Sequence, residues 1–169
     1  LTRAGEFEDI SFSLHRGEIL GIAGLIGAGR TELARCLFGD TRRSSGRVLL
    51  DGRSIEFLHP SEAIKQGIAY VPEERKRLGI FPALGVAENM TLPILSRLSR
   101  LFQIRWGKQR SVTDEFVRKF AIKISSQDQL IRNLSGGNQQ KVILGRWLAT
   151  GCRVLLLDEP TRGIDVNAK

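Results

Sequence analysis

The chain has 169 residues, of which 41% are hydrophobic and 26% are charged, the balance of a globular domain with its own core. No apolar run reaches the roughly 18 residues of a membrane span, and the first ten residues do not have the pattern of a signal peptide. The net charge of +8 admits nucleic acid or an anionic membrane as partner; because the basic residues are scattered and not interleaved with aromatics, we expect a solvated basic surface and no nucleic-acid partner.

The first half of the chain alternates short apolar runs with turns, a pattern of strands joined to helices. Gly39 is the expected stop of the first helix, and Pro60 lies in the first turn of the second. The expected strands cover residues 10–14, 18–24 and 68–72, and residues 47–53 are expected to form a strand and a turn. The expected helices cover residues 30–38 and 60–67.

The middle of the chain, residues 74–130, has helical periodicity and accumulates basic residues, with an amphipathic helix expected at 108–121. From residue 131 the strand and helix pattern returns. A helix is expected at 136–149 with Ser135 as its N-cap, followed by a buried parallel strand at 154–157. We therefore predict one α/β domain, with its core in residues 1–73 and 131–169 and a helical subdomain in residues 74–130.

Residues 24–31 (GLIGAGRT) follow an expected strand and open an expected helix, with the spacing of a Walker A phosphate loop. Glycines let the backbone wrap around phosphate, and the helix N-terminus then faces the anion. Arginine stands at the usual lysine position and would contact the β- and γ-phosphates, while the threonine hydroxyl would bind Mg²⁺. A glycine-rich turn without ligand is the alternative. The residues expected to contact nucleotide here are Gly24, Gly27, Ala28, Gly29, Arg30 and Thr31.

The apolar run at 154–157 ends in two acids, Asp158 and Glu159, which is the Walker B arrangement. Asp158 would hold Mg²⁺ directly or through water. Glu159 would orient and polarise the attacking water as a general base. Both acids would lie at the carboxyl edge of a parallel sheet, where ligands of α/β proteins bind. Taken alone, the pair is also compatible with a strand end that reaches solvent.

A third motif, LSGGNQQ at 134–140, resembles the signature of ATP-binding cassette (ABC) proteins, with asparagine in the glutamine position. The resemblance implies that this segment closes on the γ-phosphate of a nucleotide held by a partner cassette. An ordinary helix cap with two glycines is the alternative. The residues expected to form this second phosphate contact are Ser135, Gly136, Gly137 and Asn138.

Four short segments are similar to the second cassette of bacterial monosaccharide importers of the ribose type. They begin at Gly24, Val71, Leu134 and Asp158. This resemblance implies a P-loop NTPase core with a mostly parallel sheet, an antiparallel β portion near the N-terminus and a helical subdomain. It also implies ATP and Mg²⁺ as cofactors. The implied partners are a second cassette in the same full-length chain, transmembrane permease subunits and, indirectly, a periplasmic sugar-binding protein, at the cytoplasmic face of the bacterial inner membrane.

The resemblance also assigns roles to residues outside these three motifs. Glu73 occupies the Q-loop position, where the family usually has a glutamine that contacts Mg²⁺ and the attacking water; a surface acid is the alternative. Gly163, Ile164 and Asp165 occupy the D-loop, which contacts the partner cassette, although Asp165 would also suit a helix cap. Phe7 is the nearby aromatic candidate for adenine stacking, and we favour core packing for it.

The family's switch histidine lies well beyond the Walker B glutamate, whereas His15 and His59 lie upstream of it. We therefore expect the chain to be a fragment that lacks the C-terminal part of the core, with weak or no ATPase activity by itself. The full-length protein is expected to hydrolyse ATP and so to power monosaccharide import. The alternatives are a degenerate cassette that binds ATP in a regulatory role without hydrolysis, and a soluble cassette ATPase that acts on DNA or ribosomes.

Overall fold

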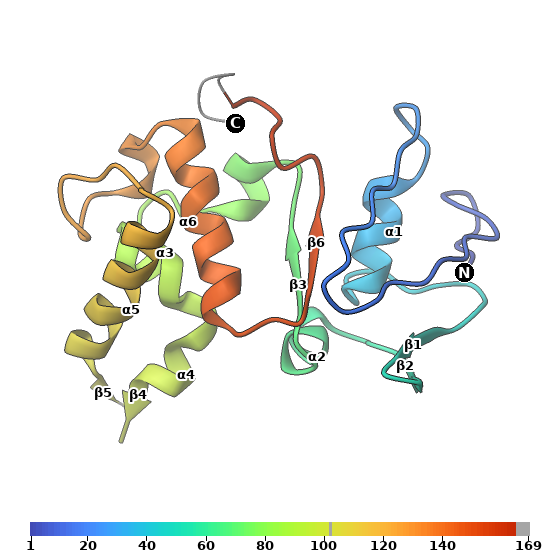
Figure 1. Cartoon of the computed structure of the whole chain (residues 1–169), viewed down its shortest axis with the longest axis horizontal. Coiled ribbons are helices and arrows are strands. Elements are labelled where there is room, and N and C mark those ends of the chain that lie inside the picture. Colours follow the sequence, from blue (N-terminus) through green and yellow to red (C-terminus); the bar gives the residue numbers. More distant parts are fainter. Residues whose placement is uncertain (102, 165–169) are drawn as a thin grey trace.

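The computed structural model describes residues 1–101 and 103–164. A parallel pair of strands lies in the middle of the molecule, with α1 on one side of it, α3 to α6 on the other and α2 below its lower end (Figure 1). The strands pair as β1 (Val48–Leu50) with β2 (Arg53–Ile55), antiparallel; β3 (Ile68–Val71) with β6 (Val154–Leu157), parallel; and β4 (Ser99–Arg100) with β5 (Gln103–Ile104), antiparallel.

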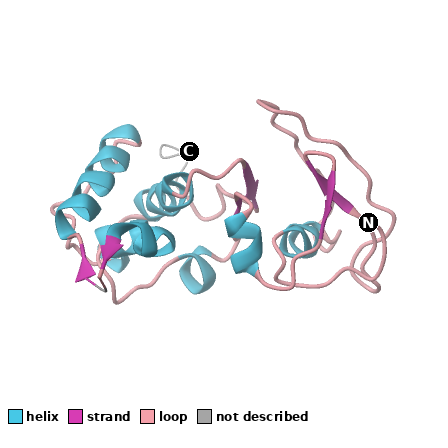
Figure 2. Cartoon of the chain, turned by 90° about the horizontal axis from the view of Figure 1, so that it is seen from below, coloured by secondary structure: helices cyan, strands magenta, loops and turns pink. Residues whose placement is uncertain are grey.

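The helices fall into two groups along the chain, and short helical turns join the elements of the second group. The α-helices are α1 (Arg30–Leu37), α2 (Pro60–Lys65), α3 (Val86–Thr91), α4 (Leu95–Leu98), α5 (Trp106–Lys119) and α6 (Gly136–Ala149). The turns are a π-helical turn η1 (Arg75–Gly79) and the 3-10 turns η2 (Leu92–Ile94) and η3 (Ile131–Asn133). Seen from below, the helical half lies beside the strand pair and the N-terminal loops lie beyond it (Figure 2).

The β3–β6 pair separates two apolar clusters because side chains of a strand alternate between its faces. All four residues of β3 are buried. Val71 belongs to a cluster with residues of α3, α5 and α6, and Tyr70 belongs to a cluster with Phe38 and Ala63 at α1 and α2. The β3 strand is therefore covered on both faces, whereas β6 is only half-buried and Leu157 at its end is 47% exposed.

Several sequence predictions are confirmed by these elements. The helices at 30–38, 60–67, 108–121 and 136–149 and the strands at 47–53, 68–72 and 154–157 are present, with ends that differ by a few residues. Pro60 is the first residue of α2, and Ser135 caps α6. Within the described residues, no helix combines the length and apolar character needed to cross a bilayer.

The strands predicted at 10–14 and 18–24 are wrong, because both segments are loops. A strand needs a neighbour for its backbone hydrogen bonds, and β6 pairs with β3 and with no other strand among the described residues. Consequently the apolar side chains of this stretch face solvent, and Ile19 is 98% exposed. The division into a core of 1–73 and 131–169 and a helical subdomain of 74–130 stays a prediction.

Candidate functional site

The phosphate loop leads directly into α1. Gly27 and Gly29 have φ angles of +81° and +78°, in the left-handed region that favours glycine. A Cβ atom on Gly29 would also collide with the backbone carbonyl oxygen of Glu6. Gly29 is the N-cap residue of α1, and no side-chain hydrogen bond caps the helix there. The first N–H groups of α1 are therefore free of a capping side chain, which is the arrangement that binds phosphate.

Arg30 and Glu159 connect the phosphate loop to the end of β6. A guanidinium nitrogen of Arg30 lies 3.5 Å from Glu159 Oε1, and the two side chains are 30% and 41% exposed. Glu159 has a φ of +42°, a conformation that a residue other than glycine adopts at a cost. The start of α1 and the Walker B acids thus meet at one place although they are far apart in sequence.

Asp158 lies beside Glu159 and is 7% exposed. Its Oδ2 accepts a hydrogen bond of 3.0 Å from the hydroxyl of Tyr70, and its backbone N–H donates to the carbonyl of Val71. Burial, and then the negative charge of Asp158, raise the pKa of Tyr70, so its hydroxyl keeps the proton that it donates. Sequence reasoning missed Tyr70, although a polar atom within an otherwise apolar buried strand needs a partner.

Thr31 and Asp158 carry oxygen atoms of the kind that suit a magnesium ion held together with phosphate. Thr31, in the first turn of α1, offers a hydroxyl, and Asp158 offers a carboxylate oxygen that Tyr70 does not occupy. Oxygen ligands of this kind, few in number and completed by phosphate and water, are typical of Mg²⁺ sites. Across residues 1–101 and 103–164 no group of three or more His, Cys, Asp or Glu forms a separate metal site.

Glu73, the Q-loop position, forms an ion pair with Arg162 of the segment after β6. The carbonyl oxygen of Arg162 in turn accepts a hydrogen bond of 3.4 Å from Arg75. The sequence predicted Glu73 as a candidate metal ligand and did not single out either arginine. The arginines that follow Glu73 and Asp158 can be read from the sequence. Only the fold shows that Arg162 forms an ion pair with the carboxylate of Glu73.

The signature segment forms the start of α6, where Ser135 is the N-cap as predicted. The Oγ atom of Ser135 accepts hydrogen bonds from the backbone and side-chain nitrogens of Asn138, at 3.4 Å and 3.0 Å. A Cβ atom on Gly136 would lie 2.9 Å from Nη2 of Arg75, the end of a flexible side chain that would have to move aside. α6 and α1 lie on opposite sides of the β3–β6 pair (Figure 1), so this segment and the phosphate loop occupy different parts of the molecule.

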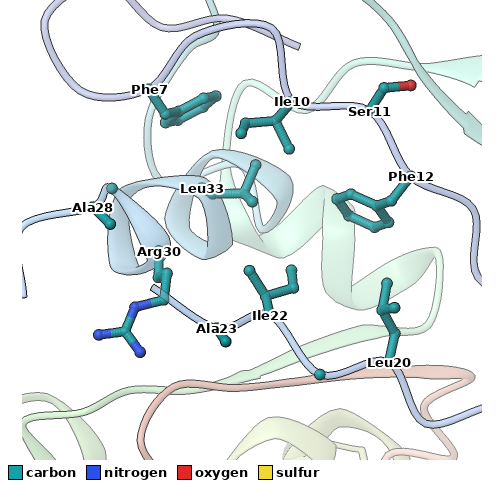
Figure 3. Close-up of a pocket in the computed structure, with 12 residues that line it drawn as sticks. Phe7, Ile10, Ser11, Phe12, Leu20, Ile22, Ala23, Ala28, Arg30 and Leu33 are labelled. Carbon is teal, nitrogen blue, oxygen red and sulfur yellow. The ribbon is translucent and has the colours of Figure 1, made fainter. Parts of the chain in front are cut away.

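An apolar pocket lies beside the start of α1 (Figure 3), between the N-terminal loop, the 18–24 segment and the phosphate loop. Phe7, one of its lining residues, is 6% exposed and packs within the molecule, as expected from the sequence.

Two of the three D-loop positions, Gly163 and Ile164, directly follow Arg162 in the chain. The backbone N–H of Ile164 donates a hydrogen bond to the carbonyl oxygen of Thr161. Asp165 lies outside the described residues.

Comparison with solved structures identifies the fold. The ATP-binding cassette MJ0796, in a dimeric post-hydrolysis state bound to ADP and Pi, matches with a TM-score of 0.79 and 22% sequence identity. The match covers 96% of this chain and 69% of that chain. A second dimeric structure of MJ0796 matches with a TM-score of 0.80. At this identity the likeness concerns the fold, and it confirms the predicted α/β class with a P-loop NTPase core.

Comparison with curated proteins identifies relatives along the whole chain. The "Putative ribose/galactose/methyl galactoside import ATP-binding protein 3" of Agrobacterium fabrum is 48% identical over 169 residues, which are 100% of this chain and 34% of the relative. The "Ribose import ATP-binding protein RbsA 2" of Rhizobium johnstonii is 49% identical over 164 residues, 97% of this chain and 32% of the relative. The chain thus spans about a third of the length of these relatives.

A family model described as "ABC transporter" matches residues 7–162, which include the phosphate loop, the signature and the Walker B acids. The match extends from the buried Phe7 to Arg162, the ion-pair partner of Glu73. This family assignment agrees with the three motifs and with the relatives that match along the whole chain. It also agrees with the arrangement of Arg30, Asp158 and Glu159 in the fold. The chain belongs to the ABC transporter family.

Proposed function

We propose that this chain is the ATP-binding and ATP-hydrolysing cassette of a longer bacterial protein that powers import of a monosaccharide of the ribose type. The observation that carries the proposal is the contact between Arg30 and Glu159, which brings the phosphate loop and the candidate general base to one place. The names of the relatives, which describe import ATP-binding proteins for ribose and galactose, support the sugar class.

In this proposal, the free N–H groups at the start of α1 and the guanidinium of Arg30 bind the phosphates of ATP. Thr31 and Asp158 hold Mg²⁺, which neutralises charge on the β- and γ-phosphates when bound. Glu159 orients the attacking water and accepts its proton. Glu73 joins the site only if its ion pair with Arg162 opens.

The signature segment and residues 74–130 are proposed to contact the other parts of the transporter. We propose that Ser135, Gly136, Gly137 and Asn138 contact the nucleotide of a second cassette, in the same full-length chain, which completes both sites. In this proposal, residues 74–130 form a helical subdomain attached to the core of 1–73 and 131–169. This subdomain passes the closing movement of the two cassettes to transmembrane permease subunits. A periplasmic sugar-binding protein delivers the sugar on the other side. This places the protein at the cytoplasmic face of the inner membrane.

A second candidate function is ATP binding without hydrolysis, and it requires that two ion pairs persist when ATP binds. Glu159 is paired with Arg30, and Glu73 is paired with Arg162, so both acids expected near the γ-phosphate already have cationic partners. A cassette in which these pairs persist after ATP binds would hold nucleotide and regulate the other site. Whether this site turns ATP over therefore separates the two functions.

The test is Glu159→Gln in a full-length protein whose other site has been inactivated. We expect single-turnover hydrolysis to fall by about a hundredfold or more, since a general base contributes about 10²–10⁴-fold, while ATP still binds. Unchanged turnover would show that Glu159 is not the base. No measurable turnover even before the substitution, with ATP bound, would favour the regulatory function.

A further inference from the structure

We infer that Tyr70 is a positioning residue of the magnesium site, because its hydroxyl fixes the carboxylate of Asp158. This inference rests on the proposed function, in which Asp158 holds Mg²⁺. Tyr70 belongs to none of the motifs that predict the site. Its hydroxyl nevertheless lies 3.0 Å from Asp158 Oδ2, and both residues are buried, with exposed fractions of 8% and 7%.

The β3–β6 register places these two side chains on one face. Tyr70 is the partner of Leu156, and Asp158 follows Leu156 by two residues. Side chains two apart in an extended strand share a face, and the hydrogen bond from the Asp158 amide to the Val71 carbonyl continues the ladder through that position. The shared face is the one that packs against α1, the helix that opens with Arg30.

The aromatic ring of Tyr70 is held in place by packing. Its centroid lies 5.5 Å from that of Phe38, and Phe38 packs edge-on against Trp147 at 5.9 Å. A ring fixed on that side presents its hydroxyl in one direction. Asp158 therefore receives a donor from a rigid element, which is the usual way in which a second layer of residues orients a metal ligand.

The hydrogen bond determines which oxygen of Asp158 is available. Because Oδ2 accepts from Tyr70, the Oδ1 atom remains for the cation or for a water molecule bound to it. Removal of the hydroxyl would leave a buried carboxylate without this donor and free to rotate about its Cβ–Cγ bond.

The test is Tyr70→Phe, which removes the hydroxyl and keeps the ring in the packing with Phe38. The full-length protein, with nucleotide binding at its other site disabled, is titrated with mant-ATP in EDTA and at increasing Mg²⁺ concentrations. We expect unchanged affinity in EDTA and a Mg²⁺ half-saturation concentration raised about tenfold, as is typical when the partner of a metal ligand is lost. If Tyr70 had a role in folding alone, the mant-ATP affinity in EDTA and the Mg²⁺ half-saturation concentration would change together, or neither would change.

Two further variants make the outcome decisive. Phe38→Leu loosens the packing that orients the hydroxyl but keeps the donor, so we expect it to raise the Mg²⁺ requirement less than Tyr70→Phe does. A larger shift than that of Tyr70→Phe would make packing the cause and overturn the inference. Asp158→Asn tests the metal site itself. If Asp158→Asn raises the Mg²⁺ requirement and Tyr70→Phe does not, the inference fails while the proposed function stands. If Asp158→Asn has no effect, the proposed metal site is wrong.

Discussion

At the scale of single residues, the feature that most affects the proposed chemistry is arginine at position 30. Its guanidinium keeps a permanent positive charge and binds oxyanions through two nitrogens, whereas lysine acts as a point charge. In the structure it contacts Glu159 across 3.5 Å, with both side chains partly exposed. A pair of this kind contributes about 1 kcal/mol or less in solvent. Phosphate bound at the start of α1 would therefore compete for Arg30 and release Glu159.

Substitution of Arg30 tests this competition. Arg30→Ala is expected to weaken ATP binding about tenfold to a hundredfold, since a hydrogen bond to a charged group contributes about 1.5–3 kcal/mol. Arg30→Lys keeps the charge and should bind ATP within a few-fold of the parent. Both are measured by nucleotide titration in the full-length protein with its other site disabled. Equal affinities for the parent and Arg30→Ala would remove Arg30 from the phosphate site.

At the scale of elements, Arg146 connects α6 to the segment that contains η1 and α3. It is 5% exposed and donates hydrogen bonds to the carbonyl oxygens of Gly79 and Asn89 and to the side chain of Asn89, at 2.5–2.9 Å. Burial lowers the pKa of Arg146 to about 10, which still leaves it charged at neutral pH. The signature helix and the predicted helical subdomain are thus joined by a buried cation and three acceptors.

We expect Arg146→Met to destabilise the protein by about 3 kcal/mol, because it leaves buried acceptors without their donor. Arg97→Met is the matched control. Arg97 also donates to carbonyl oxygens, those of Ala149 and Thr150 at the end of α6, but from an exposed position. Its loss should cost less than about 1 kcal/mol. Urea denaturation of the full-length protein measures both, and equal effects would contradict the role given to Arg146.

At the scale of the whole molecule, the N-terminal stretch distinguishes this chain from a fully packed domain. Several large apolar side chains of residues 12–26 are exposed, with Ile26 and Ile19 almost completely so. Exposed apolar side chains in such number favour association with other apolar groups. Phosphate-loop geometry also depends on this stretch, because the loop continues from it into α1.

From this we expect purified residues 1–169 to bind the dye ANS strongly and to show weak or no ATPase activity. The full-length protein should bind less dye per mole and hydrolyse ATP under the same conditions. Fluorescence and phosphate release measure the two properties. Robust turnover by purified residues 1–169 would contradict this expectation.

The amino-acid sequence by itself determined the motifs and the elements with strong local signals. The α6 cap at Ser135 and the strand before Asp158 were predicted because capping and buried apolar runs depend on neighbouring residues. Only the tertiary structure decided that residues 18–24 are not a strand and that Tyr70 reaches Asp158, 88 positions away. Strand formation needs a hydrogen-bonding neighbour, and a buried carboxylate finds its donor across the sheet, so neither outcome is encoded in local sequence.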